Sequence, residues 1–379
     1  MSPPPPPPPP SQTTIIGLSG PSSSGKTTLA RLLQSIFSKL SPPTTDPNEP
    51  NVTNLKTFIV HEDDFYHSDD KIPLIPHPRT PPTTQQIQNW DTIAAINTPF
   101  LFSSLQYIKS HGRLPPRLRS KEDLNDVTAS GVPDDVIGEL REVVRLRLLS
   151  LHSTTCFVSN QTTDREGKDE EEEGKEEKGT TRTIVFLDGF LLFAPPVEEA
   201  PSHGLRDVND IMDVRLFLPA RYENVKERRE RRSGYVTIGP APTVSNEGDE
   251  NGAGGGTELP QRGSVGEKEE EVEEVDLEKE DDGPAPTFWT DPPGYVDDIV
   301  WPNYVQEHAW LLLPEEGSQT KLPPHADTPE LVRLVGQGVN LRMDAGVTVA
   351  PGQGNASMVD ILKWAVEEVL KHIEETESQ

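Results

Sequence analysis

Apolar and polar residues alternate along the chain in two rhythms, one with the period of a strand and one with the period of a helix. Apolar, β-rich runs predict strands at 13–20, 55–66, 182–193 (ending in Asp188) and 213–220. Apolar residues at helical spacing predict helices at 26–40 and 356–375, while 90–110 is expected to be mostly helical and 221–232 to form a charged helix. Asp91 is expected to cap the second helix and Pro99 to kink it. This alternation predicts an α/β fold, with a mostly parallel sheet flanked by helices and ligands at the carboxyl ends of the strands.

The segment LSGPSSSGKTT lies between the first predicted strand and the first predicted helix. Its spacing, Gly20-x-x-x-x-Gly25-Lys26-Thr27, is typical of a loop that wraps phosphates. Glycines let successive backbone amides point inward, and the helix start adds its positive dipole end. Lys26 is expected to reach the outer phosphates and Thr27 to ligate magnesium. We predict nucleotide contacts from Gly20, Ser22, Ser23, Ser24, Gly25, Lys26, Thr27 and Thr28.

Acidic residues follow two of the predicted strands. Asp188 ends the run IVFLD, where a carboxylate can face the metal and the phosphates opposite Lys26. Asp63 and Asp64 lie in HEDDFY at the carboxyl end of the strand predicted at 55–66, and one of them can orient a hydroxyl and accept its proton, as a kinase requires. The alternative for each acid is a turn or a strand cap. A guanine switch is disfavoured because no NKxD segment occurs and Asp291-Pro-Pro-Gly294 matches DxxG only formally.

An arginine cluster occupies the helix predicted at 221–232. Arg228, Arg229, Arg231 and Arg232 could form a lid, because planar guanidinium groups suit a transferring phosphoryl group. Glu227 and Glu230 lie beside them, so a solvated helix with internal ion pairs is the alternative.

Charge and composition separate this core from segments that lack apolar residues. The chain has 379 residues and a net charge of -28, and residues 164–178 and 247–282 together contribute -17. These acidic runs are predicted to be disordered, and so negative a surface disfavours nucleic acid as a partner. No apolar run is long enough to cross a bilayer, so we expect no membrane partner and a cytoplasmic location, with the nucleus as a possible additional location. Cys156 is the single cysteine, expected to be partly buried, and no zinc spacing or internal repeat occurs.

Six segments resemble the nicotinamide riboside kinases, P-loop enzymes related to uridine kinase: LSGPSSSGKTTLARLLQ, VHEDDFY, NWD, FLDGFLLF, YENVKERRERR and PPGYVDDIVWPNYVQE. The resemblance implies a P-loop kinase fold and transfer of the γ-phosphate of ATP to the 5′-hydroxyl of nicotinamide riboside, with Mg²⁺. The proline run at 3–10 predicts a disordered tail at 1–12, and the rest of the chain, 13–379, is expected to form one kinase domain. Within that domain we expect disordered acidic inserts at 160–181 and 237–286, and a partly helical insertion at 111–155.

The same resemblance implies roles for single residues. Lys26, Asp63 and Asp188 are expected to be catalytic, with Asp63 as the base and Thr27, Asp63 and Asp188 near the metal. Arg228 and Arg232 fall on the nucleotide side. Substrate contacts are expected from Asp63, Asp64, Phe65, Tyr66, Trp90, Asp91, Arg229 and Tyr235.

Three features of this sequence depart from the family pattern. Asp188 stands where the family usually has glutamate, and Trp90 stands where tyrosine is more usual. No adenine-binding segment can be assigned by residue, although MDAGVTVAPGQGNA lies in about the right place. A uridine, cytidine or pantothenate kinase remains an alternative, as does a nucleotide-binding regulatory protein that has lost catalysis.

Overall fold

The computed structural model describes residues 12–38, 40, 55–79, 85–118, 120, 129–159, 182–232, 234–238, 286–311, 342 and 344–378. Its centre is a five-stranded sheet in the order β2-β5-β1-β6-β9, and all four strand pairs are parallel. The strands are β1 (Gln12–Ser19), β2 (Leu55–His61), β5 (Arg182–Asp188), β6 (Val214–Phe217) and β9 (Thr348–Val349). The predicted α/β fold with a mostly parallel sheet is therefore confirmed.

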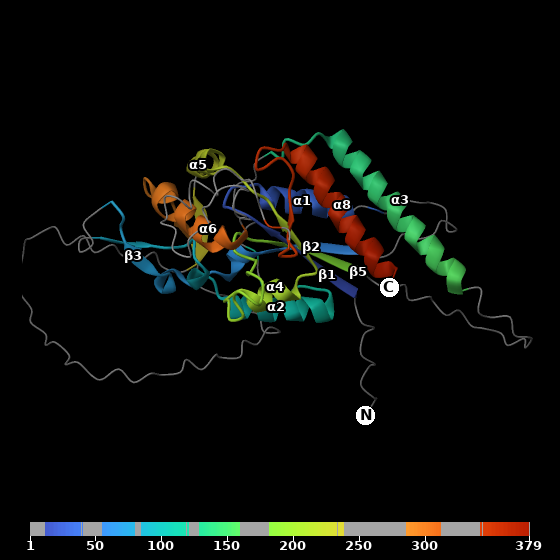
Figure 1. Ribbon diagram of the computed structural model, residues 1–379, viewed down its shortest axis with the longest axis horizontal. Coiled ribbons are helices and arrows are strands. Elements are labelled where there is room, and N and C mark those ends of the chain that lie inside the picture. The colour runs from blue at the N-terminus through green and yellow to red at the C-terminus, as the bar shows by residue number, and fades with distance from the viewer. Residues whose placement is uncertain are drawn as a thin grey trace, which may run out of the picture.

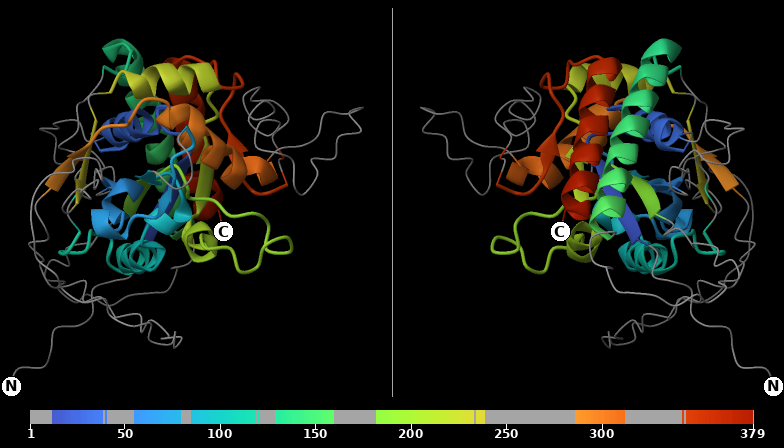
Figure 2. Two further views of the ribbon diagram at one scale, coloured as in Figure 1. Left: turned by 90° about the vertical axis from the view of Figure 1, so that its left-hand side faces the viewer. Right: turned by 90° about the vertical axis from the view of Figure 1, so that its right-hand side faces the viewer.

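Helices cover both faces of this sheet (Figure 1). One layer contains α1 (Lys26–Phe37), α3 (Asp134–Ser159) and α8 (Met358–Glu377), and Figure 2 shows α3 and α8 side by side. The other layer contains α2 (Thr98–His111) and α4 (Arg206–Ile211). Residues of β1 alternate between the layers, because Ile15 packs with α2 and α4 whereas Ile16 packs with α1 and α8. The sheet is thus buried on both faces, as its continuous apolar strands require.

Shorter elements gather at the carboxyl ends of the strands. They include the helices α5 (Tyr222–Glu230) and α6 (Trp301–His308) and the hairpins β3–β4 (Leu74–Pro76, Gln86–Gln88) and β7–β8 (Tyr235–Ile238, Pro286–Trp289). Single turns lie at η1 (Glu62–Phe65), η2 (Asp69–Lys71), η3 (Ile93–Ala95), η5 (Val296–Val300) and η6 (Ala309–Leu311). A pocket can form here because parallel strands deliver all their carboxyl ends to one edge.

The helix predicted at 90–110 is wrong in its first turns. Residues 90–92 are irregular, and α2 begins at Thr98 after a cap by Asn97, whose side chain accepts a hydrogen bond from the Phe100 amide at 3.1 Å. Pro99 occupies the first turn of α2, where its missing N–H costs nothing, so it starts the helix and does not kink it. Asp91 is not a cap and pairs with an arginine instead.

Several predicted segments lie outside the described residues. These are 1–11, 160–181 and 239–285, so the proline-rich tail and both acidic runs belong to them. Cys156 lies within α3, but its side chain is also outside the described part. Among the helices that the structure describes, none is both long and apolar enough to span a membrane.

Candidate active site

The glycine-rich loop joins β1 to α1 and turns through conformations that need glycine. Gly20 has φ +150° and Gly25 has φ +102°, and a Cβ at Gly20 would lie 2.3 Å from the Leu218 carbonyl oxygen. Lys26 is buried and its Nζ donates a hydrogen bond to the Pro21 carbonyl at 2.9 Å. The hydroxyls of Ser23 and Ser24 are buried without a hydrogen-bond partner among the described residues. The loop therefore presents polar groups and a helix N-terminus, as an anion site requires.

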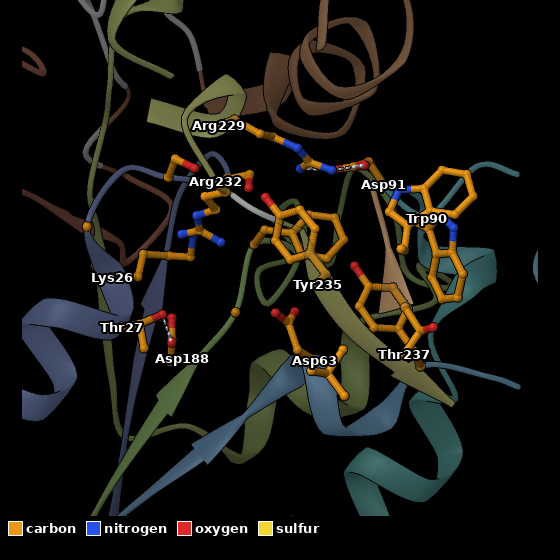
Figure 3. A pocket seen from close by; sticks show the side chains of 18 of the residues that line it. Lys26, Thr27, Asp63, Trp90, Asp91, Asp188, Arg229, Arg232, Tyr235 and Thr237 are labelled. Atoms are coloured by element: carbon orange, nitrogen blue, oxygen red, sulfur yellow. Dashed lines mark hydrogen bonds and ion pairs between the residues drawn. The ribbon is translucent and has the colours of Figure 1, made fainter. Parts of the chain in front are cut away.

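Two carboxylates lie beside this loop, one from each of two neighbouring strands. Asp188 ends β5, and its Oδ2 accepts hydrogen bonds from the Thr27 hydroxyl at 2.5 Å and from His61 Nδ1 at 3.2 Å. Asp63 lies in η1 and is the second residue after the end of β2 at His61. Both acids line the same pocket as Lys26 and Thr27 (Figure 3).

The surroundings shift the pKa values of Asp188 and Asp63 in opposite directions. Burial alone would raise the pKa of Asp188, but the His61 hydrogen bond, the positive Lys26 and the Thr27 hydroxyl together lower it. Enclosure in the pocket, followed by the negative charge of Asp188, raises the pKa of Asp63. Asp188 is thus held ionised, whereas Asp63 is more basic than an ordinary aspartate. Two acids with divergent pKa values are typical of a divided catalytic role.

Aromatic rings form the far side of the pocket. Tyr66 and Trp90 meet edge to face with ring centres 5.4 Å apart, and Trp289 lies 5.9 Å from Trp90. Tyr235 completes this wall and lies under the guanidinium groups of Arg229 and Arg232, at 5.1 Å and 5.2 Å from its ring centre. Figure 3 places Lys26, Thr27 and Asp188 on one side, Asp63 between, and Trp90 and Thr237 opposite.

Arg229 is buried between two carboxylates. Its Nη1 and Nη2 contact the two oxygens of Asp91 at 2.9 and 3.2 Å, while Nε and Nη2 contact Asp291 at 2.7 and 3.3 Å. Trp289 Nε1 donates to the same Asp291 at 3.1 Å. One guanidinium and two carboxylates leave this group with a formal charge of -1. The group ties α5 to the segments before α2 and after β8.

The structure gathers most of the predicted site residues into this pocket, but not all. Its lining includes Ser22, Ser23, Gly25, Lys26, Thr27, Thr28, Asp63, Tyr66, Trp90, Asp91, Asp188, Arg229, Arg232 and Tyr235. Gly20, Ser24, Asp64, Phe65 and Arg228 do not line it. Phe65 is packed in the core against Phe100, at 5.2 Å between ring centres, and Arg228 donates to the Ser23 carbonyl at 3.2 Å.

Sequence reasoning missed six residues of the site. Gly189 and Phe190 line the pocket directly after β5, and Val236, Thr237 and Trp289 line it from the β7–β8 hairpin. Asp291 holds Arg229 from just beyond that hairpin. The aromatic Trp289 in TFWTDPPGY was the available signal. Nothing local marks Asp291 as the partner of an arginine sixty-two positions earlier in the chain.

The pocket offers oxygen donors for a magnesium ion on the phosphate side. The Thr27 hydroxyl and the Asp188 carboxylate face each other there, and hard oxygen donors suit Mg²⁺. Within the described part of the chain, no three His, Cys, Asp or Glu side chains converge as a metal cluster. This donor set fits an ion held by few protein groups and completed by phosphates and water, as magnesium commonly is.

A parallel sheet with a phosphate loop after its central strand β1, and with acids at the end of β5 and just after its neighbour β2, is the arrangement of a P-loop kinase. The chain is also similar to the nicotinamide riboside kinase of Schizosaccharomyces pombe, at 27% identity over 79% of this chain and 81% of that relative. It is 23% identical to the nicotinamide riboside kinases of Eremothecium gossypii, over 77% of the relative, and Saccharomyces cerevisiae, over 79%. Each of those two matches also covers 79% of this chain. These similarities confirm the predicted resemblance. No family model matches the sequence.

Proposed function

We propose that this protein transfers the γ-phosphoryl group of ATP to the 5′-hydroxyl of nicotinamide riboside, giving nicotinamide mononucleotide and ADP. The observation that carries the proposal is the order of groups along one pocket: phosphate loop, then Asp63, then an aromatic wall. Similarity to three enzymes named nicotinamide riboside kinase supports the choice of substrate. The proposed domain is one kinase unit that carries its acidic runs as surface insertions.

Lys26 and the loop amides hold the donor phosphates in this proposal. Arg232 lines the pocket and adds a cation beside them, and a planar guanidinium suits the charge that develops on a transferring phosphoryl group. Positioning and charge stabilisation supply most of the rate enhancement in such reactions.

Asp63 is the proposed base. It lies between the phosphate side and the aromatic side, where a riboside 5′-hydroxyl would sit (Figure 3). Its raised pKa makes it a better proton acceptor than an ordinary aspartate, whereas the lowered pKa of Asp188 keeps that group ionised for the metal side. Thr27 and Asp188 would hold Mg²⁺, and Asp63 would lie near it. The ion, when bound, neutralises charge on the phosphates.

The aromatic side suits a flat cation. Tyr66, Trp90, Tyr235 and Trp289 offer ring faces and edges, and aromatic faces attract cations. The group made by Asp91, Arg229 and Asp291 adds a formal charge of -1 next to these rings. The pyridinium ring of nicotinamide riboside is positively charged, whereas uracil is neutral. This electrostatic match is the reason for favouring nicotinamide riboside over uridine.

A coupled ADP-release assay tests the proposal directly. The full-length protein with ATP and Mg²⁺ is offered nicotinamide riboside, uridine, cytidine and pantothenate in parallel, with Lys26→Ala as the inactive control. Fastest ADP release with nicotinamide riboside is the expected result. Preference for uridine or cytidine would establish the alternative nucleoside kinase. Absence of ADP with every acceptor, together with ATP binding, would support the regulatory alternative and overturn the proposal.

A further inference from the structure

The carboxylate of Glu62 connects β2 to β5 beyond the last paired residues of these strands. Backbone register ends at the pair His61 and Asp188, and Glu62 follows as the first residue of η1. Its side chain is completely buried, and Oε2 accepts hydrogen bonds from the amides of Phe190 at 2.7 Å and Leu191 at 3.0 Å. The Glu62 side chain thus continues the hydrogen bonding between the two segments beyond the last backbone pair of β2 and β5. Buried amides at this point need such an acceptor.

The segment after β5 packs directly against this carboxylate. A Cβ on Gly189 would lie 2.6 Å from Glu62 Oε2 and 2.7 Å from Glu62 Cβ. Contacts under 3.0 Å are too short for real carbon atoms, so either the glycine or the glutamate would have to move. The absence of a side chain at 189 therefore allows the close approach, and the two elements fit as one unit.

Both proposed catalytic acids are direct chain neighbours of this contact. Asp63 follows Glu62, and Asp188 precedes Gly189. His61, which precedes Glu62, contacts the Asp188 carboxylate at 3.2 Å. In HEDD, therefore, the first two residues hold the end of β5 and the third points into the pocket. A shift of Glu62 would change where Asp63 stands relative to Asp188.

We propose that Glu62 is a positioning residue for phosphoryl transfer. The length of its side chain holds residues 189–191 against η1 and thereby sets the placement of Asp63 opposite Asp188. This inference rests on the proposed kinase function. Only one of the two carboxylate oxygens makes these bonds, since Oε1 has no hydrogen-bond partner among the described residues. A glutamine can supply that single acceptor from the same distance, whereas an aspartate is one methylene too short. Substitutions at position 62 can therefore separate the effect of side-chain length from the effect of charge.

Three variants of the full-length protein test the proposal: Glu62→Gln, Glu62→Asp and Glu62→Ala. Glu139→Gln, an exposed position on α3, is the matched control. We expect kcat of Glu62→Gln within about threefold of wild type. Glu62→Asp and Glu62→Ala should lose kcat on the order of a hundredfold, because small misplacements of reacting groups cost about that much. KM for ATP should change less than kcat, since the hydrogen bonds described for Glu62 go to the amides of Phe190 and Leu191 and not to the phosphate loop. High kcat in Glu62→Asp with low kcat in Glu62→Gln would overturn the proposal and assign Glu62 a role that depends on its charge.

Hydrogen exchange of a peptide covering residues 189–193 gives a second readout that needs no substrate. Faster exchange in Glu62→Asp and Glu62→Ala, with protection kept in Glu62→Gln, is the expected pattern. Unchanged protection in Glu62→Asp would contradict the contact itself. If the wild type does not phosphorylate nicotinamide riboside, the proposed function fails. The exchange data still test whether Glu62 holds the amides of Phe190 and Leu191. If Glu62→Ala does not fold, the comparison of Glu62→Asp with Glu62→Gln decides.

Discussion

Replacing Asp291 by asparagine should destabilise the fold more than a comparable change at another arginine partner. Asp291 Oδ2 accepts from Arg229 Nε at 2.7 Å, and Oδ1 accepts from Arg229 Nη2 at 3.3 Å and Trp289 Nε1 at 3.1 Å. Each of these hydrogen-bond partners of Asp291 is a donor. Asparagine has one acceptor oxygen and one NH₂ group, so in either orientation a donor faces a donor.

The expected loss follows from burial. The Arg229 side chain is 6% exposed and that of Asp291 16%, so water has little access to replace the lost bond. Hydrogen bonds to charged groups contribute about 1.5–3 kcal/mol, and we expect Asp291→Asn to lower the free energy of unfolding by about that amount. The control is Asp298→Asn. Its partner Arg79 is 51% exposed, and exposed ion pairs contribute roughly 0–1 kcal/mol.

Urea unfolding of both variants and the wild type at pH 7 supplies the measurement. Asp291→Asn should also lower kcat/KM for nicotinamide riboside, because Arg229 and Asp91 line the pocket. An unfolding free energy for Asp291→Asn equal to that of Asp298→Asn would refute the reasoning. It would show that the buried group of Asp91, Arg229 and Asp291 does not hold α5 in place.

Three further predictions address the base, the acidic run and a buried histidine. Asp63→Asn should lower kcat on the order of a hundredfold or more with ATP binding retained, and near wild-type turnover would exclude Asp63 as the base. Replacing 247–282 by a short glycine-serine linker should keep activity within a few-fold, because Ile238 and Pro286 already face each other in the β7–β8 hairpin; a large fall in Tm would contradict this. Burial lowers the pKa of His308 to about 4, so the unfolded chain takes up the proton first and stability falls as pH drops below 6.5. His308→Gln should remove about 2 kcal/mol of the loss between pH 7 and pH 5, seen by urea unfolding at each pH, and an unchanged pH dependence would count against it.

The parts of the fold that are visible in the sequence are those set by neighbouring residues. The loop from Gly20 to Thr27 and the strand ending in Asp188 are local patterns, and the structure has both where they were expected. The parallel sheet followed from the alternation of elements. Phe65 lies in the core, where its apolar character would place it, although the family resemblance had assigned it to the substrate.

The sequence-based predictions that were wrong or incomplete concern contacts between distant parts of the chain. Asp91 looked like a helix cap, but it pairs with Arg229, 138 positions away. Trp289 and Thr237 enter the pocket because β7 and β8 pair across residues 239–285, and no local pattern indicates that pairing. Long-range ion pairs and hairpins with long connections leave no periodic trace in a sequence. The site could therefore be located from the sequence, but its aromatic wall and its buried charges could not be completed.

The ratio of kcat/KM for nicotinamide riboside to that for uridine tests the central claim most directly, measured for the wild type and for Trp90→Phe and Trp90→Ala. Trp90 is 5% exposed and packs with Tyr66 and Trp289, so Tm is recorded for each variant. We predict a wild-type ratio well above one, nearly retained in Trp90→Phe. In Trp90→Ala the ratio should fall by a factor of roughly 2 to 30, because a cation over an aromatic face gains about 0.5–2 kcal/mol. A wild-type ratio below one, or a ratio that Trp90→Ala leaves unchanged, would contradict the assignment of this pocket to a cationic riboside.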